Sequence, residues 1–351
     1  MLQSFTFINN FRILKRSHNL FKRISPAYNF HLNQIRTIFY TNSKESSSRK
    51  NLCLGKKQLL GREMASDGKY LDAHIIAVCQ MTSKNDVHAN FRTCKDLIER
   101  AKARRAKMVF LPEAYDYLGE TKQESLAMAQ SIKGPRMKEM CQLAKENDIW
   151  LSLGGFHNKS TDDENRISNT HVIVDNNGEI VSTYDKAHLF DVDIKDGPKL
   201  KESANCIPGN EIVPPVTTPV GKVGMAICYD LRFPEMALSL AKQGADILTF
   251  PSAFTFTTGT AHWEVLLRSR AIETQCYVVA AAQIGQTTSK RKCYGHAMVV
   301  DPWGTVIAQC HEETGLCVAE IHHQYIKQVR EQMPVWSHRR TDLYGDLKPN
   351  L

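Results

Sequence analysis

One plan of apolar runs and helical patterns occurs twice in this chain, and this repetition limits how it can fold. In each copy, short apolar runs alternate with stretches that carry apolar residues at helical spacing, and a hairpin follows. The predicted strands lie at 74–78, 108–111, 150–153, 223–227, 247–250 and 277–282, the helices at 90–105, 124–132, 135–146, 234–243 and 262–274, and the hairpins at 172–183 and 298–307.

The repeat predicts two similar halves of one α/β domain. Most of the strands are apolar along their whole length, so each sheet needs cover on both faces. Two sheets packed together, with helices on their outer faces, meet that need. We therefore place the folded domain at 70–351 and treat 1–69 as a separate N-terminal segment.

The formal net charge of +8 belongs to the N-terminal segment. Residues 1–69 hold 13 Lys or Arg and three acidic residues, a net charge of +10, whereas residues 70–351 hold 32 basic and 34 acidic residues, a net charge of −2. A nucleic-acid-binding domain needs a positive surface to neutralise phosphates. The composition therefore argues against nucleic acid as a partner of the folded domain.

The first 44 residues contain seven Lys or Arg and no Asp or Glu. This composition is typical of a mitochondrial transit peptide, whose basic amphipathic helix needs no acidic residues. The segment lacks the long apolar run of a secretory signal or a membrane span. We predict import into the mitochondrial matrix, and a second start at Met64 would give a cytoplasmic form. A disordered basic tail is the alternative.

The ten cysteines include no Cys-x-x-Cys pair, and the thirteen histidines are also scattered. This spacing indicates neither a zinc ribbon nor a thioredoxin motif, so no metal site is predicted. Scattered free cysteines fit a reducing compartment such as the cytosol or the mitochondrial matrix.

Cys228 is the best candidate for a catalytic residue. It follows the apolar run at 223–227 and precedes a helical pattern, so a strand-to-helix turn can present its thiol to a substrate. The first turn of a helix favours a thiolate and offers free N–H groups to an oxyanion. A buried structural cysteine is the alternative, because free cysteines are commonly buried.

Two charged residues also follow predicted strands. Glu113 comes after the run at 108–111, at the carboxyl end of a predicted strand. In open α/β sheets, ligands bind at the carboxyl ends of the strands. Lys186 follows the first hairpin and stands among apolar and aromatic residues. Alone, the glutamate would most often be solvated, and the lysine would be a surface charge with its stem packed.

Three short motifs carry these residues: Phe-Leu-Pro-Glu at 110–113, Tyr-Asp-Lys-Ala-His-Leu-Phe at 184–190, and Cys-Tyr-Asp-Leu-Arg-Phe-Pro-Glu at 228–235. In this order and spacing they resemble the carbon-nitrogen hydrolase (nitrilase) superfamily, and the resemblance extends from about residue 73 to residue 344. It implies an α/β fold of a particular kind, the α-β-β-α sandwich of the nitrilase type.

The resemblance also implies a mechanism. Cys228 would attack an amide carbonyl and form a thioester, with Glu113 as the proton acceptor. Lys186 would act as proton donor and oxyanion stabiliser, helped by the backbone N–H of Tyr229. Glu202, at the position of the family's second glutamate, would hold Lys186 and help to place the hydrolytic water. No cofactor is required.

Substrate-binding residues are expected near the nucleophile. Tyr229 follows it directly, and Arg232 could meet a substrate carboxylate, with a structural ion pair as the alternative. Ser252 follows the predicted strand at 247–250. This turn is the second copy's counterpart of the turn that carries Glu113, so Ser252 should face the site. On the next helix, Arg270 and Glu273 favour a surface ion pair at i, i+3 spacing over a ligand contact.

Within the superfamily, the segment 228–283, Tyr294-Gly295-His296 and the tail at 338–345 resemble the Nit branch, especially its deaminated glutathione amidases. This resemblance implies cleavage of the amide bond of deaminated glutathione to 2-oxoglutarate and Cys-Gly, which repairs a damaged metabolite. Three alternatives stay open: an ω-amidase on 2-oxo dicarboxylic monoamides, a Cys-His hydrolase of the papain type, and a non-catalytic scaffold or binding protein. The expected partners are a small-molecule substrate and further copies of the chain, in a dimer or higher homo-oligomer, without nucleic acid or membrane.

We expect residues 1–65 to carry a fused fluorescent protein into mitochondria and to be removed there, because the segment has the composition of a transit peptide. Imaging and a gel of the fusion measure the two outcomes. A fusion of the chain from Met64 onward is the control and should stay in the cytoplasm. A cytoplasmic signal from residues 1–65, with no shortened product, would favour the basic tail instead.

Overall fold

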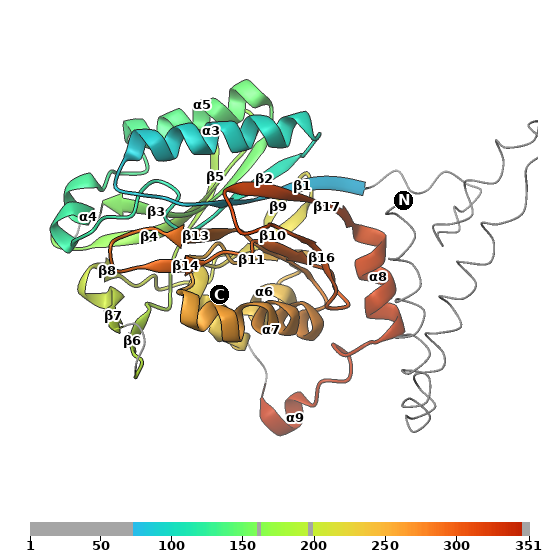
Figure 1. Cartoon of the computed structure of the whole chain (residues 1–351). Coiled ribbons are helices and arrows are strands. Elements are labelled where there is room, and N and C mark those ends of the chain that lie inside the picture. Colours follow the sequence, from blue (N-terminus) through green and yellow to red (C-terminus); the bar gives the residue numbers. More distant parts are fainter. Residues whose placement is uncertain (1–72, 160–162, 196–198, 346–351) are drawn as a thin grey trace, which may run out of the picture. The chain divides into compact units, whose positions relative to one another are not determined.

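The computed structural model describes residues 73–159, 163–195 and 199–345 (Figure 1). The segment 1–69, with its transit-peptide prediction and its boundary, lies outside the described residues. The described chain is a mixed α/β fold that contains two large sheets.

The first sheet contains the strands of the first copy in chain order. β1, β2 and β3 are parallel, and β4 and β5 follow antiparallel. Their bounds are β1 Ala73–Met81, β2 Met108–Leu111, β3 Trp150–Lys159, β4 Ile167–Val174 and β5 Ile180–Asp185. Parallel neighbours need crossover connections. α3 (Val87–Ala103) lies in the first crossover, and α4 (Lys122–Met128) and α5 (Pro135–Asn147) lie in the second.

The second sheet repeats this arrangement, which confirms the predicted repeat. β10, β11 and β12 are parallel, β15 and β16 follow antiparallel, and β9 pairs with β10 at the other edge. The bounds are β9 Val216–Thr218, β10 Gly221–Met225, β11 Ile247–Thr249, β12 Tyr277–Ala280, β15 Met298–Val300 and β16 Val306–Gln309. α6 (Pro234–Lys242) and α7 (Phe256–Thr274) lie in the crossovers.

Some predicted bounds are wrong. The single strand predicted at 277–282 is two strands, because the chain passes from β12 to the first sheet, where β13 (Ala282–Gln286) pairs in parallel with β1. The helix predicted at 262–274 begins six residues earlier, as α7. The prediction also omitted β17 (Gly315–His322), which pairs antiparallel with β1.

The remaining elements are short. They are β6 Asp191–Asp193, β7 Lys199–Lys201, β8 Cys206–Ile207, β14 Lys292–Tyr294, the 3₁₀ helices η3 Glu202–Ala204 and η4 Cys228–Arg232, and the helices α8 His323–Gln332 and α9 Thr341–Tyr344. β6 pairs with β7, β8 with β4, and β14 with β13.

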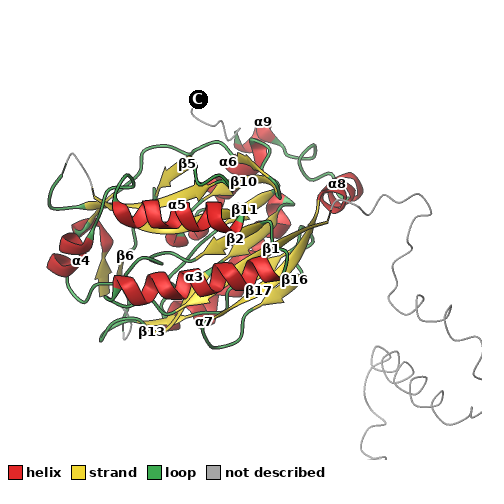
Figure 2. Cartoon of the chain, turned by 90° about the horizontal axis from the view of Figure 1, so that it is seen from above, coloured by secondary structure: helices red, strands yellow, loops and turns green. Residues whose placement is uncertain are grey.

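The sheets pack face to face, and the helices cover their outer faces. In Figure 1, α3 and α5 lie above the first sheet and α6 and α7 lie below the second, and Figure 2 shows α3 and α5 crossing over the strands. Side chains alternate along β2: Met108 and Phe110 join the apolar cluster between the sheets, whereas Val109 and Leu111 pack with α3 and α5. The α-β-β-α sandwich is therefore confirmed.

The two sheets come into close contact at a pair of glycines in β3. A Cβ at Gly154 would lie 2.0 Å from the Cβ of Pro251 and 2.8 Å from the carbonyl oxygen of Leu111. Gly155 has φ +70°, and a Cβ there would lie 2.8 Å from the Cγ of Glu113. The absence of side chains at both positions lets the strand ends of the two sheets meet beside Glu113.

We expect Gly154→Ala to lower the free energy of unfolding by about 1–3 kcal/mol, the usual cost of overpacking a dense core. Urea unfolding followed by circular dichroism measures the change. Gly315→Ala is the matched control, because a Cβ there meets nothing within 4 Å, and it should change stability by less than about 0.5 kcal/mol. Equal stabilities of the two variants would contradict a tight contact at Gly154.

Candidate active site

Glu113 lies just beyond the end of β2, where the two sheets meet. The chain turns sharply after it, because Ala114 has φ +58°, in the left-handed region. Glu113 is buried, with 6% of its surface exposed. Its Oε1 accepts hydrogen bonds from Lys186 Nζ and Asn169 Nδ2, both at 2.9 Å, and its Oε2 accepts one from the Ala253 N–H at 2.9 Å.

Lys186 directly follows β5 and is a buried cation between two carboxylates. Its Nζ donates to Glu113 Oε1 at 2.9 Å and to Glu202 Oε1 and Oε2 at 3.1 and 2.9 Å. Glu202, in η3, also accepts hydrogen bonds from the Phe190 N–H at 2.7 Å and from Asn169 Nδ2 at 3.3 Å. An ammonium group buried alone would be strongly unfavourable, so the two carboxylates stabilise it where it lies.

Cys228 occupies the turn after β10. Its φ of +48° is uncommon for a residue other than glycine, and such a conformation costs about 1–3 kcal/mol. Its N–H donates to the Pro251 carbonyl at 3.0 Å. The thiol and the Glu113 carboxylate form a hydrogen bond that shifts the pKa of each. The structure thus brings together Cys228, Glu113, Lys186 and Glu202, in agreement with the sequence prediction of a shared site.

The segment after Cys228 differs from the prediction. Cys228–Arg232 is the short 3₁₀ helix η4, and α6 begins only at Pro234. Burial, followed by the nearby Glu113 carboxylate, raises the pKa of the Cys228 thiol, and the charge of Lys186 offsets this only in part. The thiol is therefore protonated at neutral pH, and the prediction of a thiolate stabilised by a helix is wrong.

Glu113 and Lys186 form an ion pair at neutral pH. Burial raises the pKa of Glu113, but the charges of Lys186 and Arg291 and a hydrogen bond from Cys228 lower it well below its ordinary value. Burial lowers the pKa of Lys186, but the charges of Glu113 and Glu202 raise it well above its ordinary value. The site therefore holds an ionised carboxylate beside a neutral thiol, and such a carboxylate can accept the thiol proton.

A buried carboxylate joins the Lys186 segment to the nucleophile turn. Asp230, in η4, is fully buried, and its Oδ2 accepts hydrogen bonds from the Tyr184 hydroxyl and the Ile227 N–H, both at 2.8 Å. Its Oδ1 accepts the His188 N–H at 3.1 Å and lies 2.7 Å from His188 Nδ1. Because Tyr184 and His188 flank Lys186, one carboxylate links the Lys186 segment to the turn that carries Cys228. The sequence motifs include these residues but indicated no role for them.

Arg232 is half-buried near the nucleophile turn. Its guanidinium carbon lies 5.8 Å from the centroid of the Tyr229 ring and 5.5 Å from that of Phe254, and Nη1 lies 3.3 Å from His262 Nδ1. The Tyr229 ring also packs edge-on against Phe190. Arg232 forms no ion pair with a carboxylate in the described part of the chain. The alternative of a structural ion pair therefore has no support, and the guanidinium can meet an anionic group.

The Ser252 hydroxyl forms a hydrogen bond within its own turn. The residue is fully buried, and its Oγ donates to the Phe250 carbonyl at 2.9 Å. The hydroxyl donates its proton within the turn, so the structure gives no support to the predicted contact of Ser252 with substrate. The turn contributes to the site through the next residue, since the Ala253 N–H binds Glu113.

Three polar residues of the site were missed by the sequence analysis. Asn169 bridges Glu113 and Glu202. Gln283, in β13, donates to the Glu113 carbonyl at 3.0 Å, and Arg291 lies close enough to lower the pKa of Glu113. One signal was present for Asn169 and Gln283, since a polar residue in a buried strand needs a hydrogen-bonding partner.

Arg270 and Glu273, on α7, form the predicted ion pair, but the predicted surface location is wrong, because Arg270 is buried. Arg270 Nη1 pairs with Glu273 Oε1 at 2.9 Å, which confirms the i, i+3 ion pair. Arg270 Nε also donates to the Leu231 carbonyl at 2.9 Å. The buried guanidinium therefore supports η4, which begins with the nucleophile.

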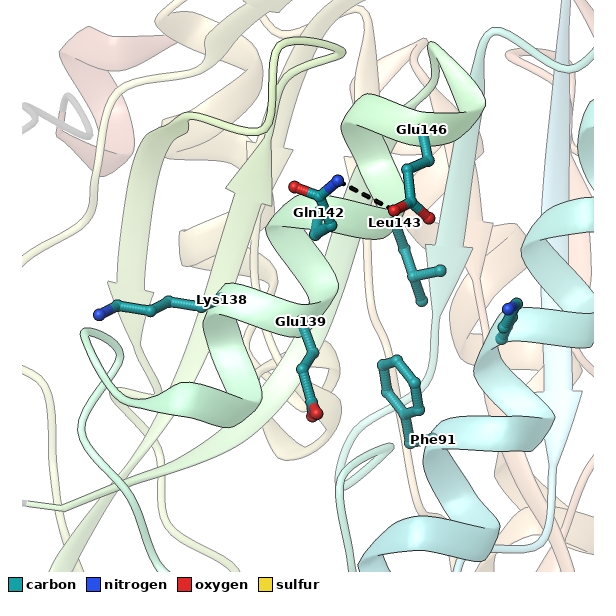
Figure 3. A pocket seen from close by; sticks show the side chains of 7 residues that line it. Phe91, Lys138, Glu139, Gln142, Leu143 and Glu146 are labelled. Carbon is teal, nitrogen blue, oxygen red and sulfur yellow. Dashed lines mark hydrogen bonds between the residues drawn. The ribbon is translucent and has the colours of Figure 1, made fainter.

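A concave surface lies between α3 and α5, on the outer face of the first sheet (Figure 3). It is lined by Phe91, Lys95, Lys138, Glu139, Gln142, Leu143 and Glu146. None of these residues belongs to the catalytic cluster. Within the described ranges, no group of His, Cys, Asp and Glu side chains could hold a metal ion, and no helix is long and apolar enough to cross a membrane.

Comparison with known proteins identifies the class to which this fold and site belong. The family model for carbon-nitrogen hydrolases matches residues 75–331. The deaminated glutathione amidase of Bos taurus is 52% identical over 288 residues, which cover 82% of this chain and 88% of that protein. The chain therefore belongs to the carbon-nitrogen hydrolase family, whose members are enzymes that act on non-peptide carbon–nitrogen bonds.

Solved structures agree with this assignment. The crystal structure of the Caenorhabditis elegans NitFhit protein has a TM-score of 0.75 and 52% identity, over 79% of this chain and 67% of that chain. The crystal structure of Saccharomyces cerevisiae Nit3, described as a member of branch 10 of the nitrilase superfamily, has a TM-score of 0.68 and 30% identity, over 77% of this chain and 97% of that chain.

We expect kcat/KM for an amide to stay nearly constant from about pH 5 to about pH 8. A group whose pKa is lowered stays ionised until the pH falls below its ordinary range, so the Glu113 carboxylate remains a base throughout this window. Initial rates across this range measure the profile, and circular dichroism at each pH checks the fold. A loss of activity centred near pH 6.5 would instead indicate a histidine base.

Proposed function

We propose that this protein is an amidase that hydrolyses the amide bond of deaminated glutathione to 2-oxoglutarate and Cys-Gly, through a thioester on Cys228. The observation that carries the chemistry is the buried Glu113–Lys186–Glu202 ion-pair cluster beside a neutral thiol. The name of the Bos taurus relative, at 52% identity over most of both chains, supports the choice of substrate.

In the first half-reaction, Glu113 accepts the thiol proton while the sulfur of Cys228 attacks the amide carbonyl carbon. The carbonyl oxygen becomes an oxyanion, which Lys186 Nζ and the Tyr229 N–H stabilise. Glu113 then donates its proton to the departing nitrogen. The carbon–nitrogen bond breaks, Cys-Gly leaves with a neutral amine, and the acyl group remains as a thioester.

In the second half-reaction, water replaces the amine. Glu113 accepts a proton from the water, and the resulting hydroxide attacks the thioester carbonyl. The new oxyanion forms beside Lys186, and its collapse releases 2-oxoglutarate and the thiolate, which recovers the proton from Glu113. Glu202 keeps Lys186 in place through both half-reactions and, with Asn169, helps to position the water.

The substrate carries carboxylates, and burying them without partners would be costly. Arg232 supports an anionic substrate, because it lies four residues after the nucleophile and forms no ion pair with any described carboxylate. The aromatic rings of Tyr229 and Phe254 hold the guanidinium from two sides. Tyr229 and Arg232 thus remain the proposed substrate-binding residues.

The structure bears differently on the three alternatives, which are a papain-type hydrolase, a non-catalytic scaffold and an ω-amidase. After burial, the strongest effects on the pKa of Cys228 come from Glu113, Lys186 and the Ala253 N–H rather than from a histidine, so a papain-type Cys-His pair has no support. An intact catalytic cluster argues against a non-catalytic scaffold. An ω-amidase would use the same residues, and only its substrate profile distinguishes it.

We further propose that the enzyme acts in the mitochondrial matrix, with a cytoplasmic form that starts at Met64, and that it is a homo-oligomer. The absence of Asp and Glu from residues 1–44 supports the mitochondrial location. Large apolar side chains on α7 support self-association, because Phe256, Val265 and Ile272 are 47%, 65% and 52% exposed.

We expect deaminated glutathione to give the highest kcat/KM among deaminated glutathione, 2-oxoglutaramate and a simple nitrile, because the proposed site binds an acyl carboxylate and releases a dipeptide. Initial rates with the three compounds measure this order. Preference for 2-oxoglutaramate would make the protein an ω-amidase, and preference for the nitrile would make it a true nitrilase.

Cys228→Ala is the control for the site and should abolish turnover, since it removes the nucleophile. Its circular dichroism spectrum should match that of the unaltered protein. Mass spectrometry of the unaltered protein during turnover should find a 2-oxoglutaryl adduct on Cys228. Substantial activity in a folded Cys228→Ala variant would contradict the proposed mechanism.

A further inference from the structure

Arg291 is a cation that the catalytic mechanism does not use. It stands just before β14, at the end of the turn that connects β13 to β14. The tip of this turn is fixed from the loop after β2, because the Glu120 carboxylate accepts hydrogen bonds from the Ser289 N–H at 2.9 and 3.0 Å and from its hydroxyl at 2.7 Å. The Thr287 N–H donates to the Arg291 carbonyl at 3.0 Å. The backbone hydrogen bond from Thr287 and the contact between Glu120 and Ser289 therefore fix the position of Arg291.

The Arg291 guanidinium has donors to spare. Its Nη2 donates to the Ala253 carbonyl at 2.6 Å. Its Nε is buried and has no hydrogen-bonding partner among the described residues, and no described carboxylate forms an ion pair with the side chain. A buried guanidinium without a directly bonded anion is unfavourable, because burial removes the water that would otherwise solvate it.

Arg291 is close to the catalytic residues. It binds the carbonyl of Ala253, whose N–H binds Glu113 Oε2 at 2.9 Å. Burial lowers the pKa of Arg291, but Cys293 and then Glu113, Cys228 and Glu202 raise it above the ordinary value. The unpaired donors therefore belong to the site that surrounds the nucleophile.

We propose that Arg291 binds the carboxylate at the 2-oxo acid end of the acyl group and is a specificity-determining residue for 2-oxoglutaryl amides. This inference rests on the proposed function. A carboxylate can accept two hydrogen bonds from a planar guanidinium, and an ion pair in a buried site is the partner that Arg291 lacks.

Arg291 fits the acyl end of the substrate better than the dipeptide end. The acyl group stays bound through both half-reactions, so a buried ion pair can hold it throughout. Cys-Gly must leave before water attacks, and a buried ion pair would retain it. A half-buried cation such as Arg232 suits a carboxylate that has to depart.

The test compares Arg291→Gln with three amides: deaminated glutathione and 2-oxoglutaramate, which share the acyl group, and pentanamide, which has no carboxylate. The glutamine amide can still donate to the Ala253 carbonyl. We expect the fall in kcat/KM to be roughly tenfold to a hundredfold larger for both 2-oxoglutaryl amides than for pentanamide, the value of a charged hydrogen bond. Lys290→Gln removes the same charge from an exposed neighbour and is the matched control.

A binding measurement tests the same point without turnover. In the Cys228→Ala background, calorimetric titration with 2-oxoglutarate should show weaker binding when Arg291→Gln is added and unchanged binding when Lys290→Gln is added. Arg291→Lys, which keeps the charge but not the planar fork, should restore part of the affinity. This variant also serves if Arg291→Gln fails to fold.

Three outcomes would overturn the inference. Equal losses for all three amides would show that Arg291 acts through Glu113 or the Ala253 turn, and a loss for deaminated glutathione alone would place the dipeptide carboxylate at Arg291. Unchanged kinetics and unchanged 2-oxoglutarate binding would remove Arg291 from substrate recognition. If the unaltered protein cleaves 2-oxoglutaramate but not deaminated glutathione, the proposed function fails while the role of Arg291 can still be measured.

Discussion

The arrangement of the site depends on one buried ammonium group. Lys186 Nζ is shared between Glu113 and Glu202 at distances of 2.9 to 3.1 Å, although the carboxylates come from different parts of the chain. Removal of either carboxylate would leave a buried charge with less compensation, which is strongly destabilising. The positions of β2, β5 and η3 relative to one another are therefore linked through this single cation, and Asn169 strengthens the link by binding both carboxylates.

The repeated fold explains why these groups can meet. Glu113 and Cys228 each follow a parallel strand, one in each sheet. A residue in the left-handed region turns the chain at both places: Ala114, directly after Glu113, and Cys228 itself. The sheets approach at Gly154, where no side chain separates them. The chain then passes from one sheet to the other between β12 and β13, so that β13 brings Gln283 against the Glu113 carbonyl. The two halves thus form one site rather than two.

The sequence predicted this fold well where apolar periodicity was strong. The strand at 108–111 and the helix that begins at Pro135 were found because buried strands and helix starts leave clear patterns. β17 was missed because no hairpin turn links it to a neighbouring strand, and its partner β1 lies far away in sequence. Glu113, Lys186, Glu202 and Cys228 were predicted from motifs, and the structure places them together. Arg291 was missed because its role depends on a contact with Ala253, which lies far away in sequence.

The protonation states of the site suggest how the proposed reaction avoids creating an unpaired charge. Before attack, Lys186 faces two negative charges, on Glu113 and Glu202, while the Cys228 thiol is neutral. When Glu113 accepts the thiol proton and sulfur attacks the carbonyl, the charge of Glu113 disappears as the oxyanion appears. Lys186 then still faces two negative charges, one of them on the substrate. A fixed cation can therefore stabilise both states without reorganisation, which is the main advantage of a preorganised site.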